Sequence, residues 1–206
     1  MIRVDLTQGS EVWSQWRGGG IGGSDAAAIM GVSPYQSRQE LLEHKLKNKH
    51  GFIRKTDKGK TEAMLRGTRM EPMVRQLYMD LTGNFVEVAC GISQDHDWMR
   101  ASFDGLSLDG LLALEIKVPN WRDHRCSLDG QVPTHYYPQV QHLLAVSQAK
   151  QLHYISFSEN KQFTEAERLS PPVRVKPDLD YIADLIRAEA EFVEELKILR
   201  KSLSAG

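Results

Sequence analysis

Residues 100–119 read RASFDGLSLDGLLALEIKVP, and this stretch predicts a β-hairpin. The pair Asp109-Gly110 lies between two apolar runs, which is the strongest short-range signal for a two-residue type I′ turn. A two-residue loop at these positions places Asp104 of the first strand directly opposite Glu115 of the second. The hairpin therefore predicts two carboxylates that face each other.

Facing carboxylates repel each other unless a cation lies between them. Lys117 follows Glu115 by two residues, and the period of a strand places both side chains on one face. Oxygen ligands of this kind are typical of Mg²⁺ and Mn²⁺ sites, in which the ion keeps several waters. The pattern predicts a divalent-metal site formed by Asp104 and Glu115. Taken alone, so short and frequent a pattern is better explained by an exposed hairpin in which Glu115 and Lys117 neutralise each other.

The composition is that of an ordinary globular protein of 206 residues, with 41% hydrophobic and 26% charged residues. We expect residues 1–206 to form a single domain that ends in a helix over about 178–203. No apolar run approaches the ~20 residues needed to cross a bilayer, and the first residues lack the apolar region of a signal peptide. Cys90 and Cys126 match no metal or disulfide pattern, so we expect free thiols and a cytoplasmic protein without membrane contact.

The charge is unevenly distributed, although the net charge is only −1. Lysine and arginine dominate residues 45–75, which include a predicted basic loop over 49–61, whereas acidic residues dominate 178–195. A basic segment of this kind can form a local phosphate-binding surface within a nearly neutral protein. Solvated helix faces explain the same distribution, so the charge alone does not decide between them.

A glycine-rich segment near the N-terminus predicts an anion site. Arg17 precedes glycines at 18–20 and 22–23, and Ser24-Asp25 then opens an alanine-rich helix with Ser24 as its expected N-cap. Backbone N–H groups at such a helix start face an anion, which makes this a plausible terminal-phosphate pocket. No GK[ST] follows the glycines, so the segment is not an ATP-binding P-loop. A flexible connection to a capped helix is the alternative interpretation.

The remaining pattern predicts an α/β (mixed α+β) fold with a mixed sheet and helices on both sides. Pro72 is expected to kink or restart the helix predicted over 61–81. Glu71, the residue before Pro72, is a third candidate carboxylate. A loop over 119–133 carries Trp121 and basic residues that suit a nucleic-acid strand. The expected helices are 37–48, 61–81, 134 to about 147 and 178–203, and the expected strands are 84–92, 99–103, 110–118, 150–157 and 173–176.

Five short motifs occur in a fixed order along the chain. They are Q-G-x-x-x-W-x-x-x-R-x-x-x-I-x-x-S (Gln8 to Ser24), G-x-x-x-E (Gly67 to Glu71), S-x-D-G (Ser102 to Gly105), E-I-K-x-P (Glu115 to Pro119) and Q-V-Q (Gln139 to Gln141). In this order and spacing the chain resembles the lambda-phage-type alkaline exonucleases, the YqaJ-like viral recombinase branch of the PD-(D/E)XK nucleases. The resemblance covers roughly residues 8–158, with Phe103 in place of the family's proline.

The resemblance implies a PD-(D/E)XK restriction-endonuclease-like core and a 5′→3′ exonuclease that digests one strand of double-stranded DNA from its ends. The implied cofactor is Mg²⁺, with Mn²⁺ as a substitute, held by Asp104, Glu115 and the Ile116 carbonyl. Glu71 would assist, and Lys117 would orient or activate the attacking water. The residues implied to bind the 5′-terminal phosphate are Arg17, Ser24, Ser102 and Gln139.

The resemblance also implies a ring-shaped homotrimer that leaves 3′ single-stranded overhangs for a single-strand annealing protein in phage-type recombination. The setting would be the cytosol of a bacterial host, with the gene carried by a phage or prophage. Two alternatives stay open at this point: a PD-(D/E)XK endonuclease of restriction or junction-resolving type, and a DNA-end-binding module without catalysis. His135 and His142 are expected to be structural.

Overall fold

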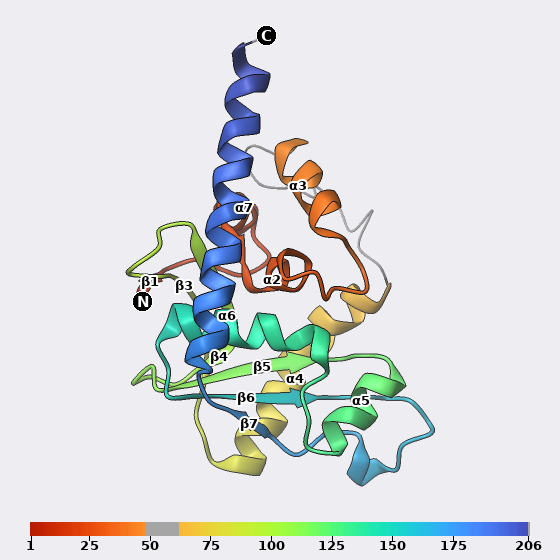
Figure 1. The fold of residues 1–206 in the computed structure, drawn as a ribbon. Helices are drawn as coiled ribbons and strands as arrows, with labels where there is room; N and C mark the ends of the chain where they lie inside the picture. Colours follow the sequence, from red (N-terminus) through yellow and green to blue (C-terminus); the bar gives the residue numbers. More distant parts are fainter. Residues whose placement is uncertain (48–61, 206) are drawn as a thin grey trace.

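The computed structural model describes residues 1–47 and 62–205, so the basic loop predicted at 49–61 lies outside the described residues. A seven-stranded mixed sheet forms the centre of the protein (Figure 1), with strand order β1-β3-β4-β5-β6-β7 and β2 paired in parallel with β4. Neighbouring strands along this order are antiparallel except for the parallel pair β5 and β6. The strands are β1 (Ile2–Val4), β2 (Ile21–Gly22), β3 (Glu87–Ile92), β4 (Met99–Leu106), β5 (Leu112–Lys117), β6 (Gln151–Ser156) and β7 (Val173–Val175).

The register predicted for the β4–β5 hairpin is confirmed. Gly105 pairs with Leu114 and Leu106 pairs with Ala113, which is the register that sets position 104 opposite position 115. Strand β5 then continues in parallel with β6, its partner on the other side. The predicted meander of β3, β4 and β5 is therefore present, and β5 lies between two neighbours in the middle of the sheet.

The predicted two-residue type I′ turn is wrong. The Ser107 N–H donates to the Leu112 carbonyl at 2.9 Å, so the loop holds the four residues 108–111. Only Gly110 within it has a positive φ, of 72°. The Asp109 carboxylate accepts hydrogen bonds from the Ser107 hydroxyl at 2.6 Å and the Leu111 N–H at 3.0 Å. These side-chain bonds stabilise an ordinary turn at Asp109, so the loop lengthens while the register is kept.

A β-bulge in β4 determines where Asp104 lies. The pairing of β3 with β4 shifts between Glu87 and Ala89. Asp104 and Gly105 therefore lie opposite the single residue Val88, which is the arrangement of a bulge. Bulges of this kind redirect a side chain and interrupt pairing, and here the interruption occurs at the aspartate of the predicted site.

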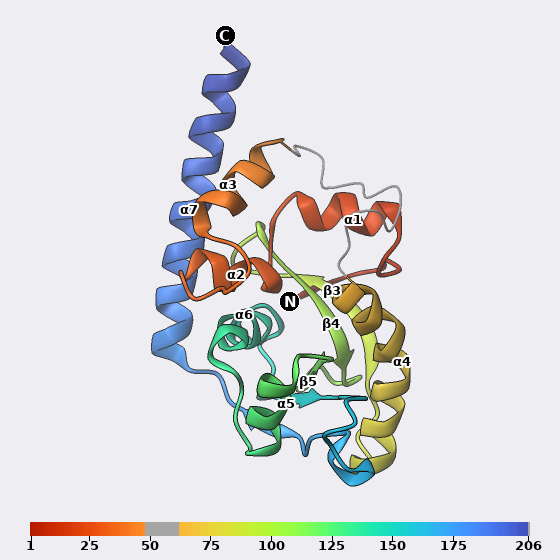
Figure 2. The same ribbon diagram turned by 90° about the vertical axis from the view of Figure 1, so that its right-hand side faces the viewer.

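Helices cover both faces of the sheet, as predicted (Figure 2). Helix α4 (Glu62–Thr82) packs Val74 and Tyr78 against one face. It continues through Pro72, so of the kink or restart predicted there the restart does not occur. Helix α6 (Tyr137–Ser147) follows the short 3₁₀ helix η1 (Thr134–Tyr136) and packs Val140 and Leu143 against the other face. The helix predicted to begin near residue 134 is therefore confirmed.

A second apolar cluster joins the N-terminal helices to the C-terminal one. Helices α2 (Gly23–Ile29) and α3 (Arg38–Lys47) pack against α7 (Leu179–Ala205), which extends beyond the rest of the protein (Figure 1). The predicted capping box at the start of α3 is present, because the Ser37 N–H donates to Glu40 and the Glu40 N–H donates to the Ser37 hydroxyl. The long helix predicted at 178–203 is confirmed as α7.

The segment predicted as a loop at 119–133 contains a helix, α5 (Trp121–Leu128). Its N-cap is Asn120, whose side chain accepts the N–H groups of Arg122 at 2.9 Å and Asp123 at 3.1 Å. Helix α1 (Glu11–Gly18) and the 3₁₀ helix η2 (Glu165–Glu167) complete the described elements. Among the residues that the structure describes, no helix has the length and apolar character needed to cross a membrane.

Candidate active site

Asp104 and Glu115 lie at the point where β4 and β5 separate. The Asp104 carboxylate accepts the Ile116 N–H at 2.7 Å, in the place that a backbone carbonyl would take if the ladder continued. Glu115 is 2% exposed, and one oxygen of its carboxylate accepts from both Lys117 Nζ and the Gln139 amide, the latter at 2.6 Å. The structure therefore brings the two predicted carboxylates and the predicted lysine into one group.

The carboxylates share a buried environment that disfavours their charge. Burial raises the pKa of Glu115 to about 8, because the Lys117 charge opposes the effect of burial only in part and the charges of Asp104 and Glu71 add smaller increases. Burial also raises the pKa of Asp104. Burial opposes the charge of Lys117 as well, but the three surrounding carboxylates raise its pKa above the usual value. A buried cluster of acids around one ammonium group is an environment that favours an additional cation.

Helix α4 brings two more side chains to this group. Burial and the nearby Asp104 charge raise the pKa of Glu71, so the third predicted carboxylate lies close to the other two. Arg75, one helical turn later, donates from Nε to the backbone carbonyl of Asp104. Sequence reasoning missed Arg75, although its spacing of four residues from Glu71 places both on one face of α4.

An aromatic ring also contacts Lys117. The Lys117 ammonium lies 5.2 Å from the centre of the Tyr136 ring, in a cation–π contact that was not predicted. His135 precedes Tyr136, lies 3.6 Å from the Asp123 carboxylate and packs against Tyr35. Burial lowers the pKa of His135, which favours a neutral ring. Its buried Nε2 has no hydrogen-bond partner among the described residues, so the structural role expected for His135 stays a prediction.

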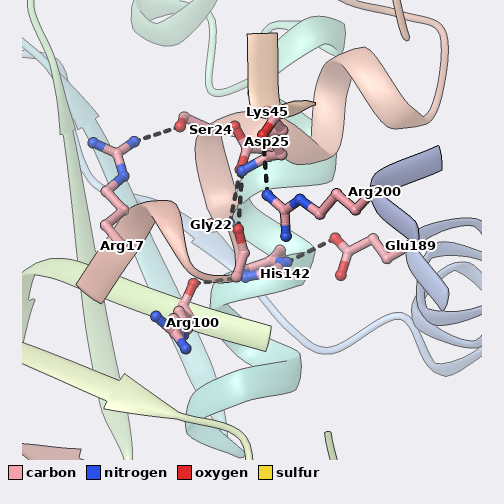
Figure 3. Close-up of polar contacts among 10 residues, drawn as sticks. Arg17, Gly22, Ser24, Asp25, Lys45, Arg100, His142, Glu189 and Arg200 are labelled. Atoms are coloured by element: carbon pink, nitrogen blue, oxygen red, sulfur yellow. Dashed lines mark hydrogen bonds and ion pairs between the residues drawn. The ribbon is translucent and has the colours of Figure 1, made fainter. Parts of the chain in front are cut away.

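The predicted phosphate-binding residues form a second group beside α1 and α2. This group is called the anion group below, after the phosphate that its residues are predicted to bind. Arg17 donates to the Ser24 hydroxyl, as Figure 3 shows. The Arg17 guanidinium also lies 5.1 Å from the centre of the Trp13 ring, and the Trp13 indole donates to the Ser102 hydroxyl at 2.9 Å. Trp13 thus links Arg17 and Ser24 to Ser102, a residue of β4 two positions before Asp104.

Ser24 does not cap α2, which corrects the prediction. The N-cap is Gly22, and its N–H donates at 3.0 Å to the carboxylate of Asp25 (Figure 3). The Ser24 side chain is therefore available to Arg17. Ser24 and Asp25 are neighbours in the sequence. Only the tertiary contacts distinguish the Asp25 side chain, which bonds to the N-cap residue, from the Ser24 side chain, which faces outward.

Gln139 lies between the two groups. Its side chain packs so closely on α2 that a Cβ added at Gly23 would lie 3.2 Å from the Gln139 Cγ. Its amide donates to Glu115. The first turn of α6 thus connects the start of α2 with the buried carboxylates, which places the anion group and the acidic group side by side.

The acidic group fits a divalent metal by the chemistry of its donors. Asp104 and Glu115 supply hard oxygen ligands, and Mg²⁺ characteristically takes one or two carboxylates while keeping several waters. Within residues 1–47 and 62–205, no three His, Cys, Asp or Glu side chains form a metal cluster on their own. The arrangement therefore suits an ion that shares its coordination with water and substrate and does not suit a closed structural metal site.

Known structures share this fold. The alkaline exonuclease of Laribacter hongkongensis is 25% identical with a TM-score of 0.80, covering 95% of this chain and 97% of that chain. Its complex with dAMP gives 26% identity and a TM-score of 0.80, with the same coverage. A phage-related exonuclease from Haemophilus somnus 129PT shares the fold at 11% identity and a TM-score of 0.64, covering 89% of this chain and 96% of that one. A search of curated proteins finds no match.

The fold is PD-(D/E)XK-like and of the exonuclease type. This follows from the mixed sheet with helices on both faces and from these similarities. The family of the YqaJ-like viral recombinase domain matches residues 12–150, which include both residue groups described above. The chain belongs to this family.

Proposed function

We propose that this protein is a divalent-metal-dependent exonuclease that digests one strand of double-stranded DNA from its 5′ end. The observation that carries the proposal is the adjacency of two groups: the buried acids Asp104 and Glu115, and the anion group of Arg17 and Ser24. Gln139 connects them, because it donates to Glu115 and packs on Gly23, the residue before Ser24. A site that holds the terminal phosphate beside the reacting phosphodiester acts at ends and has a defined polarity. Similarity to the alkaline exonuclease of Laribacter hongkongensis, which is also known in complex with dAMP, supports this reading.

Asp104, Glu115 and the Ile116 carbonyl would hold Mg²⁺ or Mn²⁺. The Ile116 N–H faces Asp104, and in an antiparallel pair the N–H and C=O of a residue face the same neighbouring strand, so the carbonyl lies on that side too. When bound, the metal would supply Lewis-acid activation of the phosphate and of a water molecule. Glu71 lies close enough to assist from α4.

Lys117 would act as a positive charge and not as a base. The surrounding carboxylates raise its pKa, so the ammonium form persists through neutral pH. In that form it orients the attacking water and stabilises the negative charge that develops on the phosphate. Tyr136 also contacts the ammonium group, through the cation–π interaction. Arg17, Ser24 and Ser102 would bind the 5′-phosphate, with Gln139 aligning it to the acids.

The proposal includes assembly and partners. We propose a ring-shaped homotrimer that keeps hold of DNA and passes its 3′ overhangs to a single-strand annealing protein of a phage or prophage in the bacterial cytosol. An apolar stripe on α4 supports assembly, since Met73, Leu77 and Leu81 are 42%, 38% and 61% exposed at a spacing of four residues.

The proposal is tested with linear duplex DNA labelled on either strand and with covalently closed circles. In Mg²⁺ or Mn²⁺ we expect mononucleotides to leave from 5′ ends only, with circles intact and no release when a chelator is present. Prompt cutting of circles would support the PD-(D/E)XK endonuclease alternative instead. Tight binding of ends without nucleotide release would support the inactive end-binding module.

A further inference from the structure

Asp25 is the centre of a polar network behind the anion group (Figure 3). Its carboxylate accepts the Gly22 N–H at 3.0 Å and pairs with Lys45 Nζ at 2.8 Å. Lys45 also donates to the Gly20 carbonyl at 2.9 Å. The two side chains therefore hold both ends of residues 20–22, which are Gly20 and the two-residue strand β2. These residues form the turn of the chain from α1 into α2 and lead directly to Ser24.

The turn has little room to shift. Gly20 packs so closely on the chain before β4 that an added Cβ would lie 2.4 Å from the Trp98 carbonyl oxygen. Lys45 is itself held from α7, because Arg200 donates to the Lys45 carbonyl at 3.0 Å (Figure 3). The ammonium group that reaches Asp25 is thus anchored through α3 to the C-terminal helix.

Asp25 faces two cations. Although burial opposes its charge, Lys45 and then Arg17 lower the pKa of the Asp25 carboxylate. Arg17 is the residue proposed to bind the terminal phosphate, and Asp25 competes with a phosphate for the same guanidinium group. Without Lys45, the partly buried carboxylate would keep Arg17 as the remaining cation that lowers its pKa, and a buried carboxylate without its partner interacts more strongly with the cations that remain.

We propose that Lys45 is a positioning residue for recognition of the DNA end. By neutralising Asp25 and bonding to Gly20, it holds the turn that presents Ser24 and leaves the Arg17 charge for the 5′-phosphate. This inference rests on the proposed function, in which Arg17 and Ser24 bind that phosphate. Lys45 touches neither the phosphate nor the reacting atoms in this role, so its effect is on selectivity for the end.

The test compares kcat/KM on duplexes with 5′-phosphate and 5′-hydroxyl ends. Lys45→Met should reduce the preference for phosphorylated ends about tenfold, the scale of one lost charge-assisted hydrogen bond, chiefly through KM. Lys45→Arg, which keeps the charge, should restore most of the preference. Arg38→Met is the matched control, because Arg38 joins α3 to α7 through Glu195 at 2.7 Å and has no bond to the turn.

A double variant separates positioning from general structural damage. Asp25→Asn keeps an oxygen that can accept the Gly22 N–H but needs no counter-charge. Adding Lys45→Met to Asp25→Asn should therefore cost less selectivity than Lys45→Met costs alone, because only the bond to Gly20 is lost in that background, whereas two independent structural defects would add. Thermal unfolding of each variant shows that it is folded before its rates are compared.

The outcomes are distinct. A wild-type enzyme without end preference overturns the proposed phosphate pocket, and this inference with it. A wild-type preference that survives in Lys45→Met overturns this inference alone. Equal slowing on both kinds of end, or equal losses from Lys45→Met in the two backgrounds, also overturns it.

Discussion

At the scale of single residues, Lys117 is an ammonium group surrounded by acidic side chains. It shares the Glu115 carboxylate with Gln139, lies against the Tyr136 ring and is close to the charges of Asp104 and Glu71. Its ammonium group is the only positive charge that these contacts place directly on the carboxylate of Glu115. The chemistry proposed for the site depends on that charge.

Lys117→Ala should reduce nucleotide release at least about a hundredfold, because it removes a positive charge aimed at the transition state. The rate is measured in single turnover with excess enzyme, so that weaker binding does not mimic slower chemistry. Lys197→Ala is the control, since Lys197 forms an exposed ion pair with Glu194 far from the site. Unchanged turnover in Lys117→Ala would refute the assignment of the site.

The raised pKa of Glu115 predicts how stability without metal changes with pH. The carboxyl titrates near 4.5 in the unfolded chain and near 8 when folded, so the folded state binds more protons between these values. The free energy of unfolding should therefore fall as pH rises from about 4.5 to about 8 and change less above that. Denaturant titrations in a chelator measure this, and Glu115→Gln should flatten the curve.

Mg²⁺ should restore stability most strongly at the alkaline end, because the metal binds the ionised form. An identical pH profile in Glu115→Gln would contradict the prediction.

At the scale of elements, α6 joins the sheet to α7 through a buried pair. The His142 ring contacts the Glu189 carboxylate at 2.8 Å and the Arg100 carbonyl at 3.0 Å, and both side chains are fully buried (Figure 3). Burial lowers the pKa of His142, but the charge and hydrogen bond of Glu189, with smaller contributions from the Arg100 carbonyl and Asp25, together outweigh burial and raise the pKa above 6.5. His142 thus has the structural role expected for it, at the junction of three elements.

Glu189→Gln should destabilise the protein by about 2 kcal/mol at pH 6, the scale of a hydrogen bond to a charged group. A histidine with a raised folded pKa contributes stability that is complete below the unfolded value of 6.5 and is lost as pH rises through the folded value. The difference between wild type and variant should therefore shrink towards pH 9. Urea unfolding at both pH values measures it, with Glu194→Gln on the exposed side of α7 as control. A difference that stays constant with pH would exclude a charged His142.

At the scale of the whole molecule, the apolar stripe of α4 predicts self-association. Leu77→Glu combined with Leu81→Glu should convert the proposed trimer to monomers, because each charge would be buried at the interface without a partner. Light scattering after size-exclusion chromatography measures the mass. Leu203→Glu is the control, since Leu203 is 68% exposed near the end of α7 and outside the stripe. A trimer that survives both changes would place the interface elsewhere.

Local patterns predicted much of the fold. The register of β4 with β5 was predicted from a two-residue loop at Asp109-Gly110, and it holds because the four-residue loop 108–111 is centred on the same pair. A shift of one residue would turn every apolar side chain to the wrong face. The capping box of α3 and the long apolar periodicity of α7 likewise depend on residues close together in sequence. The proximity of Asp104 to Glu115 followed from that register.

Errors arose where a side chain had more than one local partner available. Asp109 bonds to its neighbours and lengthens the turn, and Asn120 caps a helix in a segment too polar to show helical periodicity. Asp25, and not Ser24, completes the start of α2 because Lys45 and Arg17 pair with different members of that dipeptide. Arg75 was missed because its partner is a backbone carbonyl 29 residues away.

The sequence by itself determined the sheet register, the main helices and the set of acids and lysine at one end of a hairpin, since these follow from spacing along the chain. Only the tertiary structure decided that the bulge at Asp104 opens the sheet there, that Gln139 of α6 joins the acids to the anion group, and that α3 and α7 hold the turn before Ser24. Those contacts link residues distant in sequence, and no local period or propensity specifies them.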